Sequence, residues 1–242
     1  MPEQVSIVIP VFNEAESLPV LAGELRAAME SLARPYEVLF VDDGSTDGSA
    51  EVLAALASSD PRVRVVRLSR NQGQSAALAA GFRRVRGEVV VTLDADLQND
   101  PADIPLLLAA LEDGYDLVSG VRVERHDSWV RRVSSRIANR VRDAVLHDGI
   151  TDVGCSLKAY RAEHLRNVPA FMGMHRFLPA LVEMQGARVR EIPVGHRPRR
   201  FGEAKYGIGN RLLRGLADLW AVRWLKKRWI DRRLEREVSP PR

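Results

Sequence analysis

Residues 5–10 read Val5-Ser6-Ile7-Val8-Ile9-Pro10, a run of mainly β-branched residues that ends in proline. Four more runs of this kind follow along the chain: Glu37–Asp42, Val63–Leu68, Glu88–Asp94 and Asp116–Gly120. Their apolar residues are nearly continuous rather than alternating, which is the pattern of parallel strands covered on both faces. The sequence therefore predicts a buried, mostly parallel sheet.

Helical patterns fill the gaps between these strands. The clearest is Ala15–Leu32, whose apolar residues recur close to every 3.6 positions. The others are Gly48–Ser58, Gln72–Arg84 and Ala102–Glu112. Strands and helices that alternate at this spacing predict βαβ units, and so an α/β fold with helices on both faces of a central sheet.

The alternation weakens after Gly120. The patterns there predict helices over Trp129–Leu146 and Met174–Gln185, strands over Ser156–Tyr160 and Val189–Val194, a basic loop over Pro193–Gly209 and a long helix over Ile208–Leu234. Because no repeat or low-complexity linker interrupts the chain, we expect one main domain, residues 1–206, with a basic amphipathic helix and tail at residues 207–242.

Composition narrows the class of protein. The 242 residues are 45% hydrophobic and 28% charged, which is typical of a globular protein. The longest stretch without a charged residue is Asn71–Phe82, which is too short for a membrane span. The acidic start of the chain predicts no signal peptide. The single cysteine, Cys155, excludes an internal disulfide framework and a Cys-rich zinc site. We therefore expect a cytoplasmic location.

The net charge of +4 hides an asymmetry. From Arg197 onward the chain carries 14 Lys and Arg against 5 Asp and Glu, whereas the first 196 residues carry 22 against 27. A basic end on a slightly acidic body predicts contact with an anionic surface or ligand.

Acidic residues follow three of the predicted strands. Glu14 follows the first strand, Asp42 and Asp43 end the second, and Asp94 and Asp96 follow the fourth. Ligands of open parallel sheets bind at the carboxyl ends of the strands, so these five side chains should converge there. Asp94, Asp96 and the nearby Gln98 amide offer oxygen ligands for a divalent cation, although such residues are also common in turns and helix caps.

Other nucleotide-binding motifs are missing. The glycines around Gly73 and Gly81 form neither a dinucleotide fingerprint nor a phosphate-binding P-loop. A basic helix can bind nucleic acid, but the sequence contains no recognised nucleic-acid module, so we expect no nucleic-acid partner.

Six blocks of residues, in order, resemble the family 2 glycosyltransferases of GT-A fold, in the branch of polyprenyl-phosphate sugar synthases. The blocks are Val8–Glu14, Val41–Ser45, Asn71–Gly73, Asp94–Asn99, Asp152–Lys158 and Arg199–Gly207. Each block alone is unspecific, but the ordered set, spread over about residues 5–225, is specific. The resemblance implies a Rossmann-like GT-A domain that binds a UDP- or GDP-sugar.

The resemblance also implies roles for individual residues in donor binding. Those expected to contact the nucleotide sugar are Pro10, Phe12, Glu14, Val41, Asp43, Asp94, Ala95, Asp96, Arg122, Arg199 and Lys205. Among these, Asp94, Asp96, Arg199 and Lys205 are implied to be catalytic, and Asp94 and Asp96 would hold Mg²⁺ or Mn²⁺ with Gln98. Phe12 stands where the family usually has Tyr, and Ala204 where Ser is common.

For the acceptor, the resemblance implies polyprenyl phosphate, whose phosphate would meet Arg131 and Ser135. These two residues are four apart and so share a helix face, although an exposed basic helix face has the same pattern. Inverting displacement by a phosphate needs little help from a base, whereas a hydroxyl acceptor would need a carboxylate to take its proton. A hydroxyl acceptor on a glycan or lipid, and a non-catalytic nucleotide-sugar-binding subunit, are the alternatives.

The carboxy-terminal helix has two interpretations. Its Leu and Trp residues, flanked by Lys and Arg, suit a helix that lies in a membrane interface, but they also suit a helix packed on the domain. The first interpretation predicts a peripheral protein on the cytoplasmic face of the membrane, with a separate membrane protein as a further partner.

Overall fold

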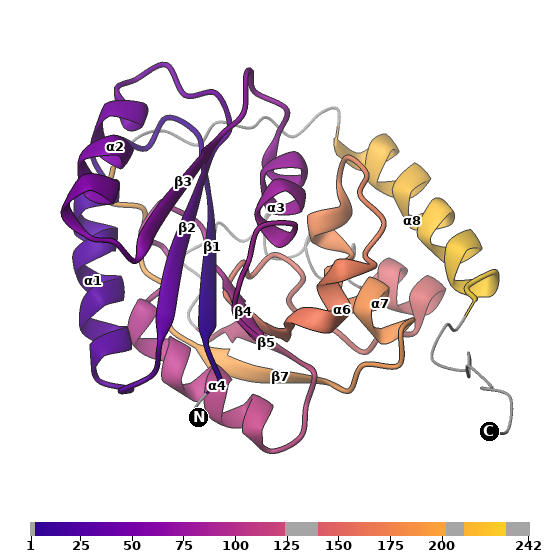
Figure 1. Ribbon diagram of the computed structural model, residues 1–242. Helices are drawn as coiled ribbons and strands as arrows, with labels where there is room; N and C mark the ends of the chain where they lie inside the picture. The colour runs from indigo at the N-terminus through magenta and orange to yellow at the C-terminus, as the bar shows by residue number, and fades with distance from the viewer. Residues whose placement is uncertain (1–2, 124–139, 202–210, 231–242) are drawn as a thin grey trace, which may run out of the picture.

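The computed structural model of the protein describes residues 3–123, 140–201 and 211–230. Within them a seven-stranded sheet has the order β3-β2-β1-β4-β6-β5-β7 (Figure 1). The strands are β1 (Val5–Val11), β2 (Tyr36–Asp42), β3 (Val63–Arg67), β4 (Val89–Thr92), β5 (Leu117–Arg122), β6 (Lys158–Arg161) and β7 (Val189–Val194). Strand β6 runs antiparallel to β4 and β5, and all other pairs are parallel. The expected mostly parallel α/β sheet is confirmed.

Helices cover both faces of the sheet (Figure 1). One face carries α1 (Leu18–Glu30), α2 (Ser49–Ser59), the short η1 (Pro101–Asp103) and α4 (Ile104–Glu112). The other carries α3 (Gln74–Phe82), α6 (Ala162–Arg166), η2 (Met174–Arg176), α7 (Leu178–Glu183) and α8 (Arg211–Lys227). Each layer buries its own hydrophobic cluster against the sheet.

Strand β1 shows why the strand patterns are continuous. Ile7 and Ile9 face the cluster under α1 and α4, while Val8 faces the cluster under α3, so that both faces of the strand are apolar. Helix α3 lies so close to β1 that a Cβ on Gly81 would overlap the side chain of Val8. Glycine at this position therefore permits the close approach of helix and sheet.

Proline explains two helix boundaries that the sequence pattern misplaced. Helix α1 begins at Leu18 rather than Ala15, with Pro19 in its first turn. The expected helix Met174–Gln185 is instead the turn η2 followed by α7, whose first turn contains Pro179. Proline lacks an N–H donor and is favoured only in the first turn, so each helix begins one residue before its proline.

Helix α8 ends at Lys227, although the pattern predicted helix as far as Leu234. Arg228 donates its backbone N–H to Leu225, an i to i−3 bond that tightens and closes the last turn. Of the expected helix Trp129–Leu146, residues 140–146 are described and helical. None of the helices in the described ranges is both long and apolar enough to cross a membrane.

Candidate active site

The five acidic residues form two groups at the carboxyl edge of the sheet. Asp96 lies close enough to both Asp94 and Glu14 to be repelled electrostatically by each of them. Asp42 and Asp43 instead turn toward neighbouring loops: Asp42 accepts the backbone N–H of Ser45 at 2.9 Å and lies 3.2 Å from the guanidinium of Arg67. The predicted convergence is therefore confirmed for Glu14, Asp94 and Asp96 alone.

Asp43 fixes the loop that leads into α3. Its two carboxylate oxygens accept the backbone N–H groups of Gln72 and Gly73 at 2.8 and 2.7 Å. The neighbouring Gly44 has a positive φ of 73°, and a Cβ there would lie 2.7 Å from the backbone of Arg70 and Asn71. The Asp-Gly pair thus clamps this loop against the end of β2. Burial raises the pKa of the Asp43 carboxyl.

The loop after β2 also positions Glu14. The hydroxyls of Ser45 and Ser49 accept the backbone N–H groups of Asn13 and Glu14, both at 2.9 Å. Asn13 adopts a left-handed φ of 54°, and so does Leu97 after β4, with a φ of 62°. Left-handed backbone is costly for a residue such as leucine and tends to occur at functional sites. Both strained turns border the acidic group.

Asp94 and Asp96 flank the buried Ala95 at the end of β4. Gln74 of α3 donates its side-chain N–H to Asp94 at 2.7 Å, and the backbone N–H of Gln98 donates to Asp96 at 3.1 Å. Desolvation, and repulsion by Asp96, raise the pKa of Asp94 to about 6. Desolvation also raises the pKa of Asp96. A bound cation would offset this repulsion.

Arg199 brings positive charge to this group from the loop after β7. Its guanidinium nitrogens lie 2.7 Å from Asp96 and 3.3 Å from Glu14. Arg197 anchors the loop, because its backbone N–H donates to Gln98 at 2.9 Å. The Arg197 side chain is 2.8 Å from Glu24 and 2.5 Å from Asp100. An isolated antiparallel β-bridge between Asn99 and His196 also joins the loop after β7 to the loop after β4.

The acidic group does not form a metal site by itself. Within the described ranges, no three His, Cys, Asp or Glu side chains are grouped so that they could hold a metal ion. Asp94 and Asp96 supply two carboxylates, and the side-chain amide of Gln98 lies on the same loop, 3.5 Å from the carbonyl of Arg197. These oxygens are of the kind that Mg²⁺ and Mn²⁺ prefer, with the remaining positions left to a ligand.

The other expected donor residues are placed differently. Pro10 lines a cavity beside Asp94, and Phe12 is half-buried. The side chain of Val41 is fully buried in the core. Arg122 forms two hydrogen bonds of 2.8 Å with Asp152 at the end of β5. The three remaining residues, Arg131, Ser135 and Lys205, lie outside the described residues.

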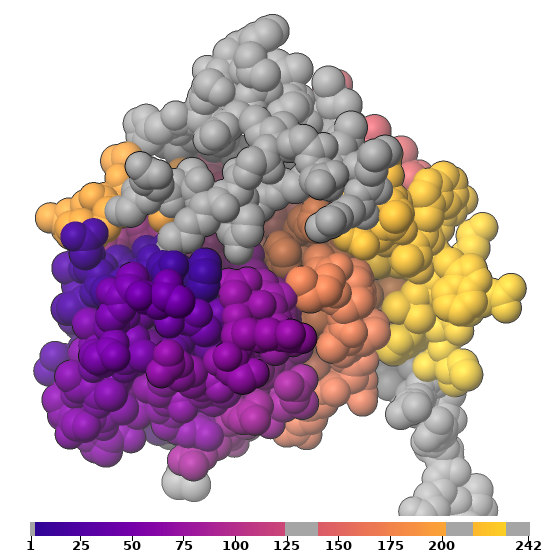
Figure 2. Space-filling model, turned by 90° about the horizontal axis from the view of Figure 1, so that it is seen from above, coloured from indigo at the N-terminus to yellow at the C-terminus, as the bar shows by residue number. Residues whose placement is uncertain are grey.

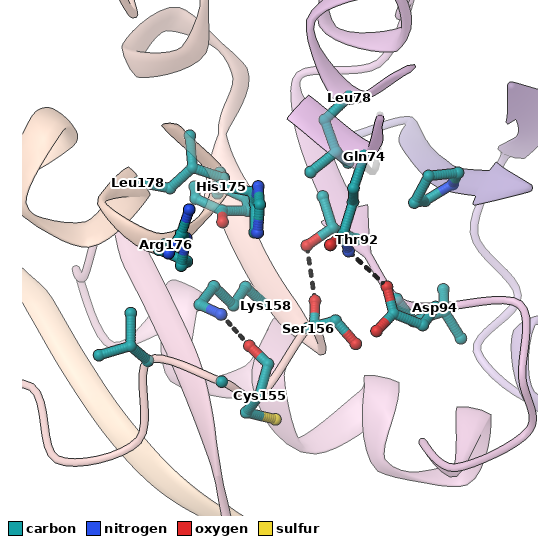
Figure 3. A pocket seen from close by; sticks show the side chains of 15 residues that line it. Gln74, Leu78, Thr92, Asp94, Cys155, Ser156, Lys158, His175, Arg176 and Leu178 are labelled. Atoms are coloured by element: carbon teal, nitrogen blue, oxygen red, sulfur yellow. Dashed lines mark hydrogen bonds between the residues drawn. The ribbon is translucent and has the colours of Figure 1, made fainter. Parts of the chain in front are cut away.

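The cavity beside Asp94 has a volume of about 350 Å³ (Figure 3). It lies between α3 and the η2–α7 segment, over β4 and β6. Gln74 and Asp94 line one side, His175 and Arg176 line the other, and Lys158 lies between them (Figure 3). A cavity of this size can hold a small organic ligand.

A family model described as glycosyl transferase family 2 matches residues 6–168. The chain belongs to glycosyltransferase family 2. Solved structures agree on the fold. Glucosyl-3-phosphoglycerate synthase from Mycobacterium tuberculosis, in complex with Mn²⁺, UDP and glucosyl-3-phosphoglycerate, superposes with a TM-score of 0.64 at 20% identity, over 93% of this chain and 77% of that one. A mannosyltransferase from Pyrobaculum calidifontis, in complex with GDP-Man and Mn²⁺, gives 0.62 at 23% identity, over 94% and 64%. The expected GT-A fold is confirmed.

Four residues of this candidate site were given no role from the sequence. Gln74, Lys158 and His175 line the cavity, and Arg197 anchors the loop carrying Arg199. One signal was available for Lys158: a lysine in a strand that is otherwise buried needs a compensating partner or a ligand. For the other three residues, only the tertiary structure reveals their place.

Proposed function

We propose that this family 2 glycosyltransferase transfers a sugar, with inversion, from a UDP- or GDP-sugar to a polyprenyl-phosphate lipid at a membrane surface. The observation that carries the proposal is the contact of Arg199 with Asp96 and Glu14 beside Asp94. Carboxylates that can bind a divalent metal ion thus lie next to a guanidinium that can bind phosphate oxygens. A nucleoside diphosphate with a bound metal matches both kinds of charge.

Donor binding is assigned to the edge formed by β1, β2 and β4. Pro10, Phe12, Glu14, Val41, Asp43 and Ala95 would surround the nucleoside, with Arg122 toward the phosphates. Two of the structures with this fold contain UDP or GDP-Man together with Mn²⁺, which supports this placement. We propose residues 1–206 as the catalytic domain.

Asp94, Asp96 and Gln98 would hold Mg²⁺ or Mn²⁺. When bound, the ion would supply positive charge to the diphosphate leaving group. The chain's own residues add to this: Arg199 already lies at the carboxylates, and Lys205 follows on the same segment. Both side chains would stabilise the charge that develops on the departing nucleoside diphosphate.

The displacement itself is simple in its atom balance. An oxygen of the acceptor phosphate bonds to the anomeric carbon, and the bond from that carbon to the donor phosphate breaks. The electron pair leaves with the nucleoside diphosphate, and the configuration at the anomeric carbon inverts. The acceptor is already anionic, so no general base is required. Arg131 and Ser135 are the proposed contacts of the acceptor phosphate.

The lipid acceptor requires access to a membrane, and α8 offers a suitable surface. Its Leu219 and Val222 are buried against the domain, whereas Leu216, Trp220 and Trp224 are 39%, 60% and 60% exposed. These three residues are four apart and so lie on one side of the helix. Figure 2 shows α8 (yellow) at one flank of the molecule.

Cationic side chains accompany this exposed apolar face. The guanidinium of Arg223 lies over the ring of Trp220, and that of Arg228 over the ring of Trp224. Indole rings next to cationic side chains suit the headgroup region of an anionic leaflet. We therefore propose that residues 207–242 attach the protein peripherally to the cytoplasmic face of the membrane, with or without a separate membrane-protein partner.

Calorimetry tests the donor half of the proposal. UDP-glucose, UDP-N-acetylglucosamine and GDP-mannose are titrated into the protein, each with and without Mn²⁺. Metal-dependent binding of one donor, lost in Asp96→Ala, is the expected result. If none of the three donors binds, the proposal in this form is wrong, and the remaining interpretations are a rarer nucleotide-sugar donor or a fold that has lost its catalytic activity.

Product analysis tests the acceptor half. Membrane extracts are incubated with the protein and the radiolabelled donor that binds. Transfer to polyprenyl phosphate gives an acid-labile, phosphodiester-linked glycolipid. An acid-stable glycoside would instead show that a hydroxyl group of a glycan or lipid is the acceptor.

A further inference from the structure

The cavity beside Asp94 contains polar side chains that the proposed mechanism does not use. His175 and Lys158 face the space between α3 and η2, opposite Asp94 (Figure 3). Neither lies at the acidic edge where the diphosphate is proposed to bind. Because they lie next to Asp94, they are close to the position expected for the group attached to the diphosphate.

His175 is held in one orientation by Ser75. Its Nδ1 lies 2.7 Å from the hydroxyl of Ser75, which also accepts the backbone N–H of Gly173 at 3.0 Å. Ser75 is buried in the first turn of α3, so this contact ties η2 to α3 across the cavity. With Nδ1 engaged by Ser75, the other ring nitrogen, Nε2, is the one turned away from α3.

Lys158 forms the floor of the cavity and is buried, with a 3% exposed fraction. Its ammonium donates a hydrogen bond to the backbone carbonyl of Cys155. An ammonium carries three N–H donors, and this is its one hydrogen bond to the described part of the chain. A buried ammonium is costly unless further acceptors meet it, so an oxygen-rich ligand would satisfy it.

The charges around the cavity are balanced. The ammonium of Lys158 interacts with the carboxylates of Asp94 and Asp152 and with the guanidinium of Arg122, which is paired with Asp152. The guanidinium of Arg176 lies 3.6 Å from Asp218. The described residues around the cavity therefore carry no excess of positive charge that would favour a second phosphate. Apolar side chains, including Leu78 and Leu178, complete the walls.

We propose that this cavity receives the sugar that is transferred, and that His175 and Lys158 bind its hydroxyl groups and thereby select it. The inference rests on the proposed function, because it places the sugar of the donor next to the carboxylates assigned to its diphosphate. A neutral ligand with many hydroxyl groups and apolar C–H faces matches the mixture of balanced charges, hydrogen-bonding groups and leucines. Arg199 then serves the diphosphate, and His175 the sugar.

The test compares each nucleotide sugar with its nucleoside diphosphate. Dissociation constants are measured by calorimetry with Mn²⁺ for UDP-glucose, UDP-N-acetylglucosamine and GDP-mannose, and for UDP and GDP. His175→Asn keeps a polar group near Ser75 but shortens the side chain that reaches into the cavity. We expect it to weaken binding of the sugar-bearing donor by about 3- to 10-fold, since one neutral hydrogen bond is lost. Binding of the nucleoside diphosphate stays unchanged.

Two further variants make the test independent of a single substitution. Lys158→Met should produce the same selective loss, because methionine fills the space without a donor. His164→Asn is the matched control, since His164 lies 3.8 Å from Asp116 and does not line the cavity. It should change neither dissociation constant, and the melting temperatures of all variants are compared with that of the unmodified protein.

The outcomes separate this inference from the proposed function. If none of the nucleotides binds, both fail together. If the nucleoside diphosphate binds and the sugar donors bind equally well to the His175→Asn and Lys158→Met variants and to the unmodified protein, the inference fails alone. It also fails if donor binding is unchanged and the variants instead raise KM for the acceptor.

Discussion

The guanidinium of Arg199 lies 2.7 Å from a carboxylate oxygen of Asp96. The two residues come from opposite parts of the chain, since Asp96 follows β4 and Arg199 follows β7. The contact closes the carboxyl edge of the sheet and offsets part of the repulsion among Glu14, Asp94 and Asp96. It also places a guanidinium beside the two carboxylates expected to hold a metal ion. Mutation of Asp96 and mutation of Arg199 should therefore have different effects on the reaction.

Asp96→Asn removes one metal-binding charge while keeping the shape of the side chain. We expect kcat/KM for glycosyl transfer to fall by about 100-fold or more, because a carboxylate is a much better ligand for a divalent cation than an amide. The rate is measured over a range of Mn²⁺ concentrations. Asp113→Asn, at an exposed ion pair with Arg190, is the control and should leave the rate unchanged. A full rate in Asp96→Asn would contradict the metal assignment.

Arg199→Gln removes the positive charge from the same place. We expect kcat to fall by about 100-fold, as for loss of a donor that stabilises charge in the transition state. Arg199→Lys should recover part of this rate, because it restores the charge but not the planar pair of donors. Arg190→Gln is the matched control on the surface. Equal rates in Arg199→Gln and the unmodified protein would remove Arg199 from the mechanism.

Arg197 acts as a positioning residue, and its variant should behave differently. Arg197→Gln breaks the ion pairs with Glu24 and Asp100 that anchor the loop carrying Arg199. We expect KM for the donor to rise about 3- to 10-fold with a smaller change in kcat. The stability cost should stay below about 1 kcal/mol, because these pairs are partly exposed. Arg197→Lys should restore KM. A change in melting temperature without a change in KM would indicate a purely structural role.

The sequence was sufficient for the sheet and for the acidic edge, but not for the contacts that complete the site. Continuous runs such as Val5–Pro10 reveal a strand buried on both faces, because burial on both faces leaves few polar positions. The antiparallel direction of β6 could not be predicted from the sequence, since Lys158–Arg161 has too few residues to indicate how it pairs. The carboxylate of Asp43, which is predicted to contact the nucleotide, also accepts two backbone N–H groups that the sequence did not reveal. Which role an acidic turn residue takes depends on the loop that packs beside it.

A buried carboxylate at the opposite end of the sheet should control stability in acid. Glu37 accepts hydrogen bonds from the Ser6 hydroxyl at 2.6 Å and the Arg86 N–H at 2.8 Å, and pairs with Arg64 at 2.6 Å. Although burial opposes ionisation, these hydrogen bonds and the Arg64 charge leave the pKa of Glu37 below its usual value. The native state therefore binds this proton less readily than the unfolded state does.

The sign of the effect follows from that lowered pKa. The stabilisation by Glu37 is present above the pKa of an unfolded glutamate, about 4.3, and is lost as the pH falls through the lower native pKa. Glu37→Gln should cost about 1–3 kcal/mol at pH 7, because it disrupts a buried hydrogen-bonded charge. It should also flatten the fall in stability below pH 4.5 or so. Urea unfolding at several pH values measures both effects, with Glu112→Gln, at an exposed ion pair, as the control. An unchanged acid slope would contradict the lowered pKa.

The exposed face of α8 gives the last prediction. Trp220→Ala combined with Trp224→Ala removes two indole rings that are 60% exposed but leaves the buried Leu219 and Val222 in place, so the fold should survive. Binding to vesicles of phosphatidylcholine and phosphatidylglycerol should weaken by at least about tenfold, since inserting one large apolar side chain is worth about 1.5 kcal/mol or more. Sedimentation with vesicles measures this.

Binding should also weaken with added salt and on phosphatidylcholine alone, because the lysines and arginines of the helix need anionic lipid. Leu106→Ala, at an exposed leucine of α4, is the control. If the double variant binds vesicles as the unmodified protein does while binding the donor normally, α8 is not the membrane contact.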